Sequence, residues 1–306
     1  MSLTRCFKSA FVLLIFATFV PATARQTASA TNIVTAKIKL NDLSMIIVPV
    51  SINGAGPYDF LLDTGCAKTI VDQTLAAELR LPSVGEKTIV GVLASNRAAV
   101  VHVNSLSVAG ATVPGGEVFS SGHIATVAGR VRGVLGEDFL RNFDLLIDYR
   151  HQDIRFESPF GSMAQTATGE HLPLELSGTL HGKPTHNRLV ISGHIPEFGD
   201  TPLLLLLDSG ANFLTLFQAN LGQSSNQQEN VQTGNFNTWI SSSAATRTIR
   251  YLSLGSHSVP NLTVVTFARH ADVDTDGLVP ASLFKSVFIS SRGGFVILNP
   301  SFPKSR

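Results

Sequence analysis

Two stretches of the chain decide the fold: residues 45–69 read MIIVPVSINGAGPYDFLLDTGCAKT, and residues 188–214 read RLVISGHIPEFGDTPLLLLLDSGANFL. Each contains an alternating apolar strand, a turn with glycine, and a second apolar strand that runs directly into Asp-Thr-Gly or Asp-Ser-Gly. The two aspartates, Asp63 and Asp208, are 145 residues apart. These stretches predict that one structural unit occurs twice in the chain.

Further landmarks repeat at nearly the same offset. Leu106-Ser107-Val108 matches Leu252-Ser253-Leu254, which lies 146 residues later, and Gly133-Val134-Leu135 matches Gly277-Leu278-Val279, which lies 144 residues later. Landmarks that keep one offset to within a residue indicate a tandem duplication of a unit of about 130 residues. We predict an N-terminal lobe over residues 31–157, a linker over 158–170 and a C-terminal lobe over 171–306.

The composition favours β structure and excludes several classes of protein. Hydrophobic residues make up 44% of the 306 residues, so a sizeable core is available. Lysine plus arginine is 23 and aspartate plus glutamate is 22, which is not the basic excess of a nucleic-acid binder. Two cysteines exclude both a disulfide framework and a cysteine-rich zinc site. Short strand signals separated by turn residues predict an all-β protein.

The first thirty residues have the layout of a secretory signal peptide. Arg5 and Lys8 precede an uncharged apolar run from Ala10 to Val20, which is shorter than the roughly 20 residues of a membrane span. Small residues place the cleavage near Ala24 or Ala30. We therefore predict a secreted or periplasmic protein without a stable membrane span after cleavage, and we favour this over the alternative, an uncleaved membrane anchor.

The two Asp-Thr/Ser-Gly loops can carry acid–base chemistry. A carboxylate at the end of a buried strand is costly unless it is hydrogen-bonded. Gly65 and Gly210 permit tight turns whose backbone N–H groups point at the carboxylates, and the hydroxyls of Thr64 and Ser209 can bond across to the other loop. Two carboxylates held side by side share one proton, which supplies both an acid and a base for the attack of water on a peptide bond.

At these residues the sequence resembles the aspartic proteases, both the bilobed pepsin-like enzymes and the bacterial retropepsin-like group, here with two retropepsin-like repeats in one chain. The resemblance spans about residues 38–298 and includes the family's second motif, two apolar residues followed by glycine. It implies a bilobed pepsin-like fold with two β-barrel-like lobes, an active-site cleft between them, and a proton-sharing catalytic pair, Asp63 and Asp208. It implies no metal or organic cofactor. The residues implied to support the loops are Thr64, Gly65, Ser209 and Gly210, and those implied to pack behind them are Val134, Leu135, Gly136, Leu278 and Val279.

The sequence departs from the family pattern in three places. Pro280 stands where the second copy of the second motif should have glycine, which removes an N–H group and fixes φ. Cys66 and Ala211 follow the glycines of the two loops and offer no hydroxyl to the carboxylates, so we expect a less acidic pair. Residues 88–103, with Gly91 near their start, should form the hairpin that covers a substrate, and they contain no tyrosine.

We therefore predict a monomeric aspartic endopeptidase that acts on peptides or proteins and binds no nucleic acid. One alternative is a non-catalytic peptide-binding module on a degenerate protease fold, which Pro280 motivates. A second is a calcium-stabilised β protein, because Asp272 to Gly277 matches the first half of a calcium-binding loop, although Leu283 stands where that loop needs glutamate. Three histidines are interpreted as solvated loop residues, not metal ligands: His171, His181 and His186.

Four local features complete the predictions. Asp72 should cap a helix over residues 72–79, and Asn53-Gly54 should form a hairpin turn, because both residues tolerate positive φ. The polar stretch 222–238 is interpreted as a loop. Cys66 is interpreted as a small packing residue, not a nucleophile, because no histidine lies near it in sequence.

Overall fold

A computed structural model describes residues 33–90, 95–122, 124, 130–175, 177–180, 183–186, 188–218, 228–235, 238–269 and 273–303. The predicted signal peptide therefore lies outside the described residues. The chain divides into Met1–Ala30 and Thr31–Arg306, and every element below belongs to the second unit. The described residues are mainly β-strands, which confirms the all-β prediction.

The first sheet contains only strands from the N-terminal half, in the order β2-β3-β4-β9-β5-β8-β7-β6. Within it β4 runs parallel to β9, and β5 runs parallel to β8. Its strands are β2 (Lys39–Leu40), β3 (Ile46–Ile52), β4 (Ala55–Leu62), β5 (Ile70–Asp72), β6 (Ser83–Val90), β7 (Ser95–Val108), β8 (Ala111–Ser121) and β9 (Gly133–Leu135).

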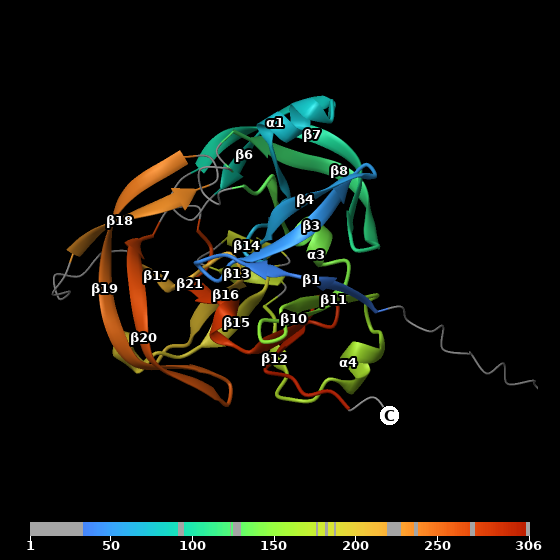
Figure 1. Cartoon of the computed structure of the whole chain (residues 1–306). Coiled ribbons are helices and arrows are strands. Elements are labelled where there is room, and N and C mark those ends of the chain that lie inside the picture. The colour runs from blue at the N-terminus through green and yellow to red at the C-terminus, as the bar shows by residue number, and fades with distance from the viewer. Residues whose placement is uncertain are drawn as a thin grey trace, which may run out of the picture. The chain divides into compact units, whose positions relative to one another are not determined.

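The second sheet contains only strands from the C-terminal half, in the order β15-β16-β21-β17-β20-β19-β18. From β3 to β6 the first sheet has the same succession of pairings, including parallel pairs at the equivalent places, β16 with β21 and β17 with β20. Figure 1 shows the two sets of strands as separate groups, blue to green and yellow to orange. The strands are β15 (Val190–Gly193), β16 (Leu203–Asp208), β17 (Leu214–Gln218), β18 (Gln228–Asn235), β19 (Thr238–Leu254), β20 (His257–Ala268) and β21 (Gly277–Pro280).

A third sheet joins strands from both halves in the order β1-β11-β10-β22-β23-β12. At its centre β10 pairs with β22 in antiparallel register, with Leu146 opposite Phe288. Its strands are β1 (Val34–Lys37), β10 (Asp144–Asp148), β11 (Asp153–Glu157), β12 (Leu172–Pro173), β22 (Ser286–Ser290) and β23 (Phe295–Leu298), and a separate hairpin pairs β13 (Ser177–Leu180) with β14 (Lys183–His186).

The helical elements are short. They are α1 (Gln73–Glu78), α3 (Glu137–Leu140), α4 (Ser162–Thr166) and two 3-10 turns, η1 (Pro196–Phe198) and η2 (Ala281–Leu283). The carboxylate of Asp72 accepts hydrogen bonds from the backbone N–H groups of Thr74 and Leu75, which confirms the predicted cap of α1. Asn53 and Gly54 have φ values of 53° and 79°, as the predicted turn requires.

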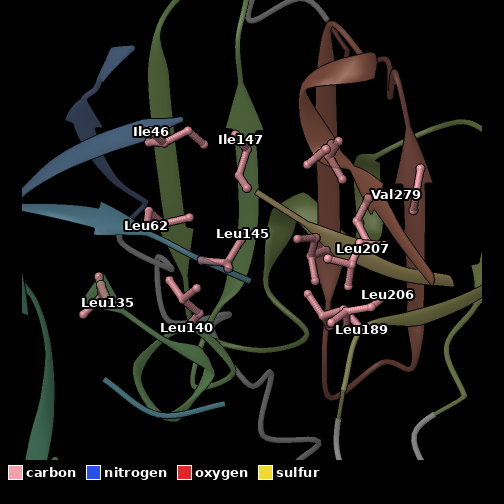
Figure 2. Close-up of a cluster of buried hydrophobic side chains, with 14 of the residues drawn as sticks. Ile46, Leu62, Leu135, Leu140, Leu145, Ile147, Leu189, Leu206, Leu207 and Val279 are labelled. Carbon is pink, nitrogen blue, oxygen red and sulfur yellow. The ribbon is translucent and has the colours of Figure 1, made fainter. Parts of the chain in front are cut away.

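One continuous apolar core connects the three sheets. Figure 2 shows Leu145 and Ile147 of β10 between Leu62 of β4 and Leu207 of β16. All four side chains are completely buried. Because β4 and β16 lead into the two Asp-Thr/Ser-Gly loops, this core fixes the start of both loops.

Two stretches contain more regular structure than their composition predicts. The predicted linker contains α4, whose first N–H groups are capped by Glu157: its two carboxylate oxygens accept from Ser162 N at 2.8 Å and from Met163 N at 2.6 Å. The prediction of a loop over residues 222–238 was wrong where the structure describes it. Residues 228–235 form β18, which pairs with β19 at the edge of the second sheet, just as β6 pairs with β7 in the first. The sequence did not predict this strand because its residues are mostly polar, and the strand is formed by backbone pairing with β19.

Candidate active site

Buried strands deliver both aspartates to the site. Asp63 follows β4 directly, and Asp208 is the last residue of β16. The N–H group of Asp63 donates to the carbonyl of Leu135 at 3.0 Å, which ties the first aspartate to β9. In the second sheet Asp208 lies opposite Pro280 of β21. We call Asp63-Thr64-Gly65 the first loop and Asp208-Ser209-Gly210 the second loop.

The hydroxyl residues of the two loops bind each other. The N–H group of Thr64 donates to Ser209 Oγ at 3.0 Å, and the N–H group of Ser209 donates to Thr64 Oγ1 at 2.9 Å. Each hydroxyl in turn donates across to the opposite strand, Thr64 to the carbonyl of Leu207 and Ser209 to that of Leu62, both at 2.8 Å. Because both side chains are buried, these four bonds lock the loops together.

The glycines bring the carboxylates against the opposite loops. Each aspartate accepts from its own loop, Asp63 Oδ1 from Gly65 N at 2.8 Å and from Cys66 N at 3.0 Å, and Asp208 Oδ1 from Gly210 N at 2.7 Å. A Cβ atom added to Gly65 would lie 2.5 Å from Asp208 Cγ, and one added to Gly210 would lie 2.7 Å from Asp63 Cγ. The structure therefore brings the predicted pair, Asp63 and Asp208, into contact across the two loops.

The two carboxyls are buried and unequal. Asp63 is 7% exposed and Asp208 is 8% exposed. Burial, the charge of Asp208 and a hydrogen bond to it raise the pKa of Asp63 well above its ordinary value, against the N–H groups of its loop. Burial also raises the pKa of Asp208, but loop N–H groups, the hydrogen bond from Asp63 and the positive charge of Arg188 oppose that rise. The hydrogen bond between the two carboxyls requires that one of them holds a proton, so the pair shares one proton.

The residues of the second motif lie behind the first loop. Val134 and Leu135 are completely buried in β9, next to β4. Gly136 follows them, and its N–H group donates to Thr69 Oγ1 at 3.2 Å. A Cβ atom at Gly136 would lie 2.7 Å from the carbonyl oxygen of Cys66, so the first loop leaves no room for a side chain there.

In the second sheet Leu278 and Val279 are buried at the equivalent places, and Pro280 replaces the glycine. Pro280 has φ −62°, which suits proline. In the first sheet the N–H group of Gly136 donates to the hydroxyl of Thr69. The equivalent residues of the second sheet are Pro280, which has no N–H group, and Leu214, which has no hydroxyl, so this hydrogen bond is missing as a whole. The structure therefore accommodates Pro280 without an unpaired group at this position.

Cys66 is half-buried and packs beside the first loop. Its thiol donates to the carbonyl of Lys68 at 3.0 Å. Burial and the charge of Asp63 raise the pKa of the Cys66 thiol well above its ordinary value. A protonated thiol is a poor nucleophile, so the structure agrees with a packing role for this side chain.

Sequence reasoning missed three groups near the loops. Arg188 binds Asp274 and the carbonyl of Gly65. Glu137 is buried with neither carboxylate oxygen hydrogen-bonded within the described part of the chain, and burial raises its pKa to about 8. The hydroxyl of Tyr149 is likewise buried without a described partner, and its pKa is raised by burial and by the charge of Asp208. Only Arg188 had a sequence signal, since it begins the second stretch where Met45 begins the first.

In the segment that resembles half of a calcium-binding loop, two aspartates form salt bridges with arginines. Asp274 pairs with Arg188 at 2.9 Å, and Asp276 pairs with Arg269 at 2.8 Å and accepts from the N–H group of Leu204. Asp272 lies outside the described residues. No group of three or more His, Cys, Asp or Glu side chains that could hold a metal ion occurs among the residues described.

Two other predictions concern the histidines and the membrane. His171 stacks on the ring of Phe295 at a centroid distance of 4.1 Å. The side chains of His181 and His186 lie outside the described part of the structure. Over the same described ranges, the chain contains no helix of the length and apolar character that a membrane crossing requires.

The chain is similar to known proteins over part of its length. No curated protein matches the chain. Among solved structures, a retropepsin-like aspartic protease from Rickettsia conorii is similar at 18% sequence identity and a TM-score of 0.31, over 42% of this chain and 93% of that one. Residues 48–139, which include Asp63 and the second motif of the first sheet, match the family model described as "Aspartyl protease". Over this segment, the chain is similar to the aspartyl protease family.

Proposed function

We propose that the protein is an aspartic endopeptidase whose catalytic pair is Asp63 and Asp208. The observation that carries the proposal is the reciprocal contact of the two loops, in which each glycine leaves room for the aspartate of the other loop. Two buried carboxyls in contact are costly for folding, and an active site is the usual reason for such a pair. The family match supports the proposal for the first loop and does not extend to Asp208.

The unequal environments of the two carboxyls support a division of roles. Asp63, whose pKa is raised further, keeps its proton and donates it to the carbonyl oxygen of the scissile peptide bond. Asp208, which the charge of Arg188 favours in the ionised form, removes a proton from a water molecule held between the carboxyls. The water oxygen bonds to the carbonyl carbon, and the nitrogen then takes the proton that Asp208 had received. The C–N bond breaks as a hydroxyl group of the intermediate returns a proton to Asp63, so both carboxyls regain their starting states. No covalent bond to the enzyme forms in this sequence.

The proposal extends to the organisation of the chain. The substrate lies extended over the two loops, and the β6–β7 hairpin, to which most of residues 88–103 belong, covers it. The mature chain acts as a monomer because both loops belong to one polypeptide. The first thirty residues direct export and are then removed. The predicted division into lobes at 31–157 and 171–306, with the linker between them, is part of the same proposal.

A peptide-library experiment tests this function. The mature chain from Arg25 is incubated with a mixed peptide library at several pH values between about 3 and 8, and the products are identified by mass spectrometry. Cleavage inside peptides is expected, and the cleavage sites then report the specificity. A folded protein that binds library peptides but cleaves none would contradict the proposal and favour the peptide-binding module.

A further inference from the structure

Arg188 lies two residues before β15, the strand that pairs with β16. In the antiparallel pair of β15 and β16, Val190 lies opposite Leu206. The N–H group of Leu207 donates to the carbonyl of Leu189 at 2.8 Å, so the register continues by one residue. Arg188 precedes Leu189, and its positive charge acts on the carboxyl of Asp208 at the end of β16. The side chain of Arg188 is 26% exposed.

The guanidinium of Arg188 joins its own half of the chain to the first loop. One nitrogen binds Asp274 Oδ1 at 2.9 Å, and another donates to the carbonyl of Gly65 at 3.3 Å. That carbonyl belongs to the same peptide group as the N–H of Cys66, which donates to Asp63 Oδ1 at 3.0 Å. A cation on the oxygen of a peptide group polarises it and strengthens its N–H as a donor. One peptide group, between Gly65 and Cys66, therefore connects the guanidinium of Arg188 to the carboxyl of Asp63.

The first sheet has an apolar residue at the equivalent place. Ile46 lies opposite Leu62, and Val190 lies opposite Leu206, so counting back along each strand makes Met45 the residue equivalent to Arg188. Met45 is buried in an apolar cluster with Leu61. The second half of the chain therefore has a cation at this position and the first half has a methionine, in an arrangement of loops that is otherwise reciprocal.

We infer that Arg188 is a positioning residue for the pair: anchored on Asp274, it holds the Gly65–Cys66 peptide against Asp63 and stabilises the pair in its singly ionised form. This inference deepens the proposed function and rests on it. The positive charge of Arg188 lowers the pKa of Asp208, which agrees with the geometry.

Three other ionisable groups near the pair are uncharged at acidic pH and cannot take the role of Arg188. Burial raises the pKa values of Glu137, Cys66 and the Tyr149 hydroxyl, so these three groups stay neutral in the acidic range. Asp138 acts on the Cys66 thiol and lies 3.9 Å from the Lys68 ammonium, a salt bridge on the surface side of the first loop. In the described part of the second half, Arg188 and its partner Asp274 form the ion pair that reaches the first loop.

Three variants of the full mature chain test the inference. Arg188→Met introduces the side chain of Met45, the residue at the equivalent position of the first sheet, and Arg188→Lys keeps the charge. Arg269→Met is the control, because Arg269 makes a similar ion pair with Asp276. The carboxyls are titrated by 13C NMR in aspartate-labelled protein, with the pair assigned through Asp63→Asn and Asp208→Asn. The dependence of kcat/KM on pH is measured with a cleaved peptide.

Arg188→Met should move the first ionisation of the pair, and the acid limb of the kcat/KM profile, to higher pH. On that limb kcat/KM should fall about tenfold at fixed pH. Arg188→Lys should restore most of the shift, and Arg269→Met should leave both curves in place. If Arg188→Met does not fold, Arg188→Gln replaces it with the same expected shift.

An unchanged carboxyl titration in a folded Arg188→Met variant would overturn the inference, whatever the activity. A shift of the same size in Arg269→Met would also overturn it, because the effect would then be a general loss of an ion pair. The titration does not depend on cleavage. A shifted titration in a protein that cleaves no peptide would therefore support the effect of Arg188 on the pair while the proposed function failed.

Discussion

Thr64 and Ser209 bind each other reciprocally: the N–H group of each residue donates to the hydroxyl oxygen of the other. Each hydroxyl also donates to the opposite strand, Thr64 to the carbonyl of Leu207 and Ser209 to that of Leu62. Neither loop can move without stretching bonds in the other. The relative position of Asp63 and Asp208 is therefore set by a hydrogen-bond network and not only by the core beneath it.

Removing one hydroxyl should weaken the fold measurably. Ser209→Ala loses the bond that Ser209 Oγ donates to the carbonyl of Leu62 and the bond that it accepts from Thr64, so the buried N–H group of Thr64 loses its hydroxyl partner. We expect the free energy of unfolding in urea to fall by about 2–3 kcal/mol. Thr64→Ser, which keeps its hydroxyl, is the control and should lose less. A change below about 0.5 kcal/mol in Ser209→Ala would contradict the interlocked loops.

The loop glycines should not tolerate even a methyl group. Gly65→Ala and Gly210→Ala each place a carbon within 2.7 Å of the carboxylate of the opposite loop, so the aspartates must separate. We expect kcat/KM to fall by about 100-fold or more. Gly116→Ala is the matched control, since a Cβ there meets nothing within 4 Å. Wild-type activity in Gly65→Ala would show that the carboxylates need not lie in contact.

Glu137 should make the protein less stable as the pH rises. Its pKa is raised by burial to about 8, so the folded chain keeps a proton that the unfolded chain loses above about 4.5. This contribution is complete at low pH and declines up to about pH 8, by at most about 1.4 kcal/mol per pH unit. Glu137→Gln should flatten the dependence of unfolding free energy on pH, measured by urea titration, whereas Glu175→Gln at an exposed position should not. Identical slopes in both variants would refute this role.

Pro280 should stabilise the fold without limiting activity. Its φ of −62° suits proline, and Leu214 offers no hydroxyl to an N–H group at position 280. Pro280→Gly should therefore lower the free energy of unfolding by about 1 kcal/mol through the entropy of the unfolded chain. We expect kcat/KM to stay within about twofold. A large gain in cleavage would instead indicate that Pro280 distorts the second loop, as the binding-module alternative holds.

The pH at which kcat/KM is maximal should be higher than in an enzyme that works in strong acid. Cleavage needs Asp208 ionised and Asp63 protonated, so Asp208 sets the acid limb and Asp63 the alkaline limb. Burial raises both pKa values, which moves both limbs toward higher pH. We expect kcat/KM on a peptide to peak between about pH 4 and 6.5. A maximum below about pH 3 would show that the carboxyls are not desolvated in this way.

Local sequence was enough to predict the centre of the site. An apolar strand that ends in Asp-Thr-Gly or Asp-Ser-Gly specifies the turn, its glycine and its hydroxyl within a few residues, and the second copy at a constant offset supplies the partner. Residues such as Thr64 and Ser209 could therefore be paired from the repeat alone. The cap at Asp72 was predictable for the same reason, since its bonds span three residues.

Features that depend on long-range packing could not be predicted in this way. Arg188 meets Gly65 across 123 residues of chain, and nothing in its local sequence specifies that contact. Glu137 is polar and adjoins Asp138, so the sequence suggests a surface position, whereas the fold buries it. The strand β18 has the composition of a loop, and only its pairing with β19 makes it a strand.

The central claim is that both carboxyls are required for the chemistry, and single substitutions test it most directly. Asp63→Asn and Asp208→Asn keep the shape of each side chain and remove its ability to hold or release the proton, with Asp200→Asn at an exposed position as the control. We predict that each of the two site variants stays folded and loses kcat/KM by about 10⁴-fold or more, while the control cleaves at the wild-type rate. A folded Asp63→Asn or Asp208→Asn variant that cleaves within about tenfold of wild type would contradict the account.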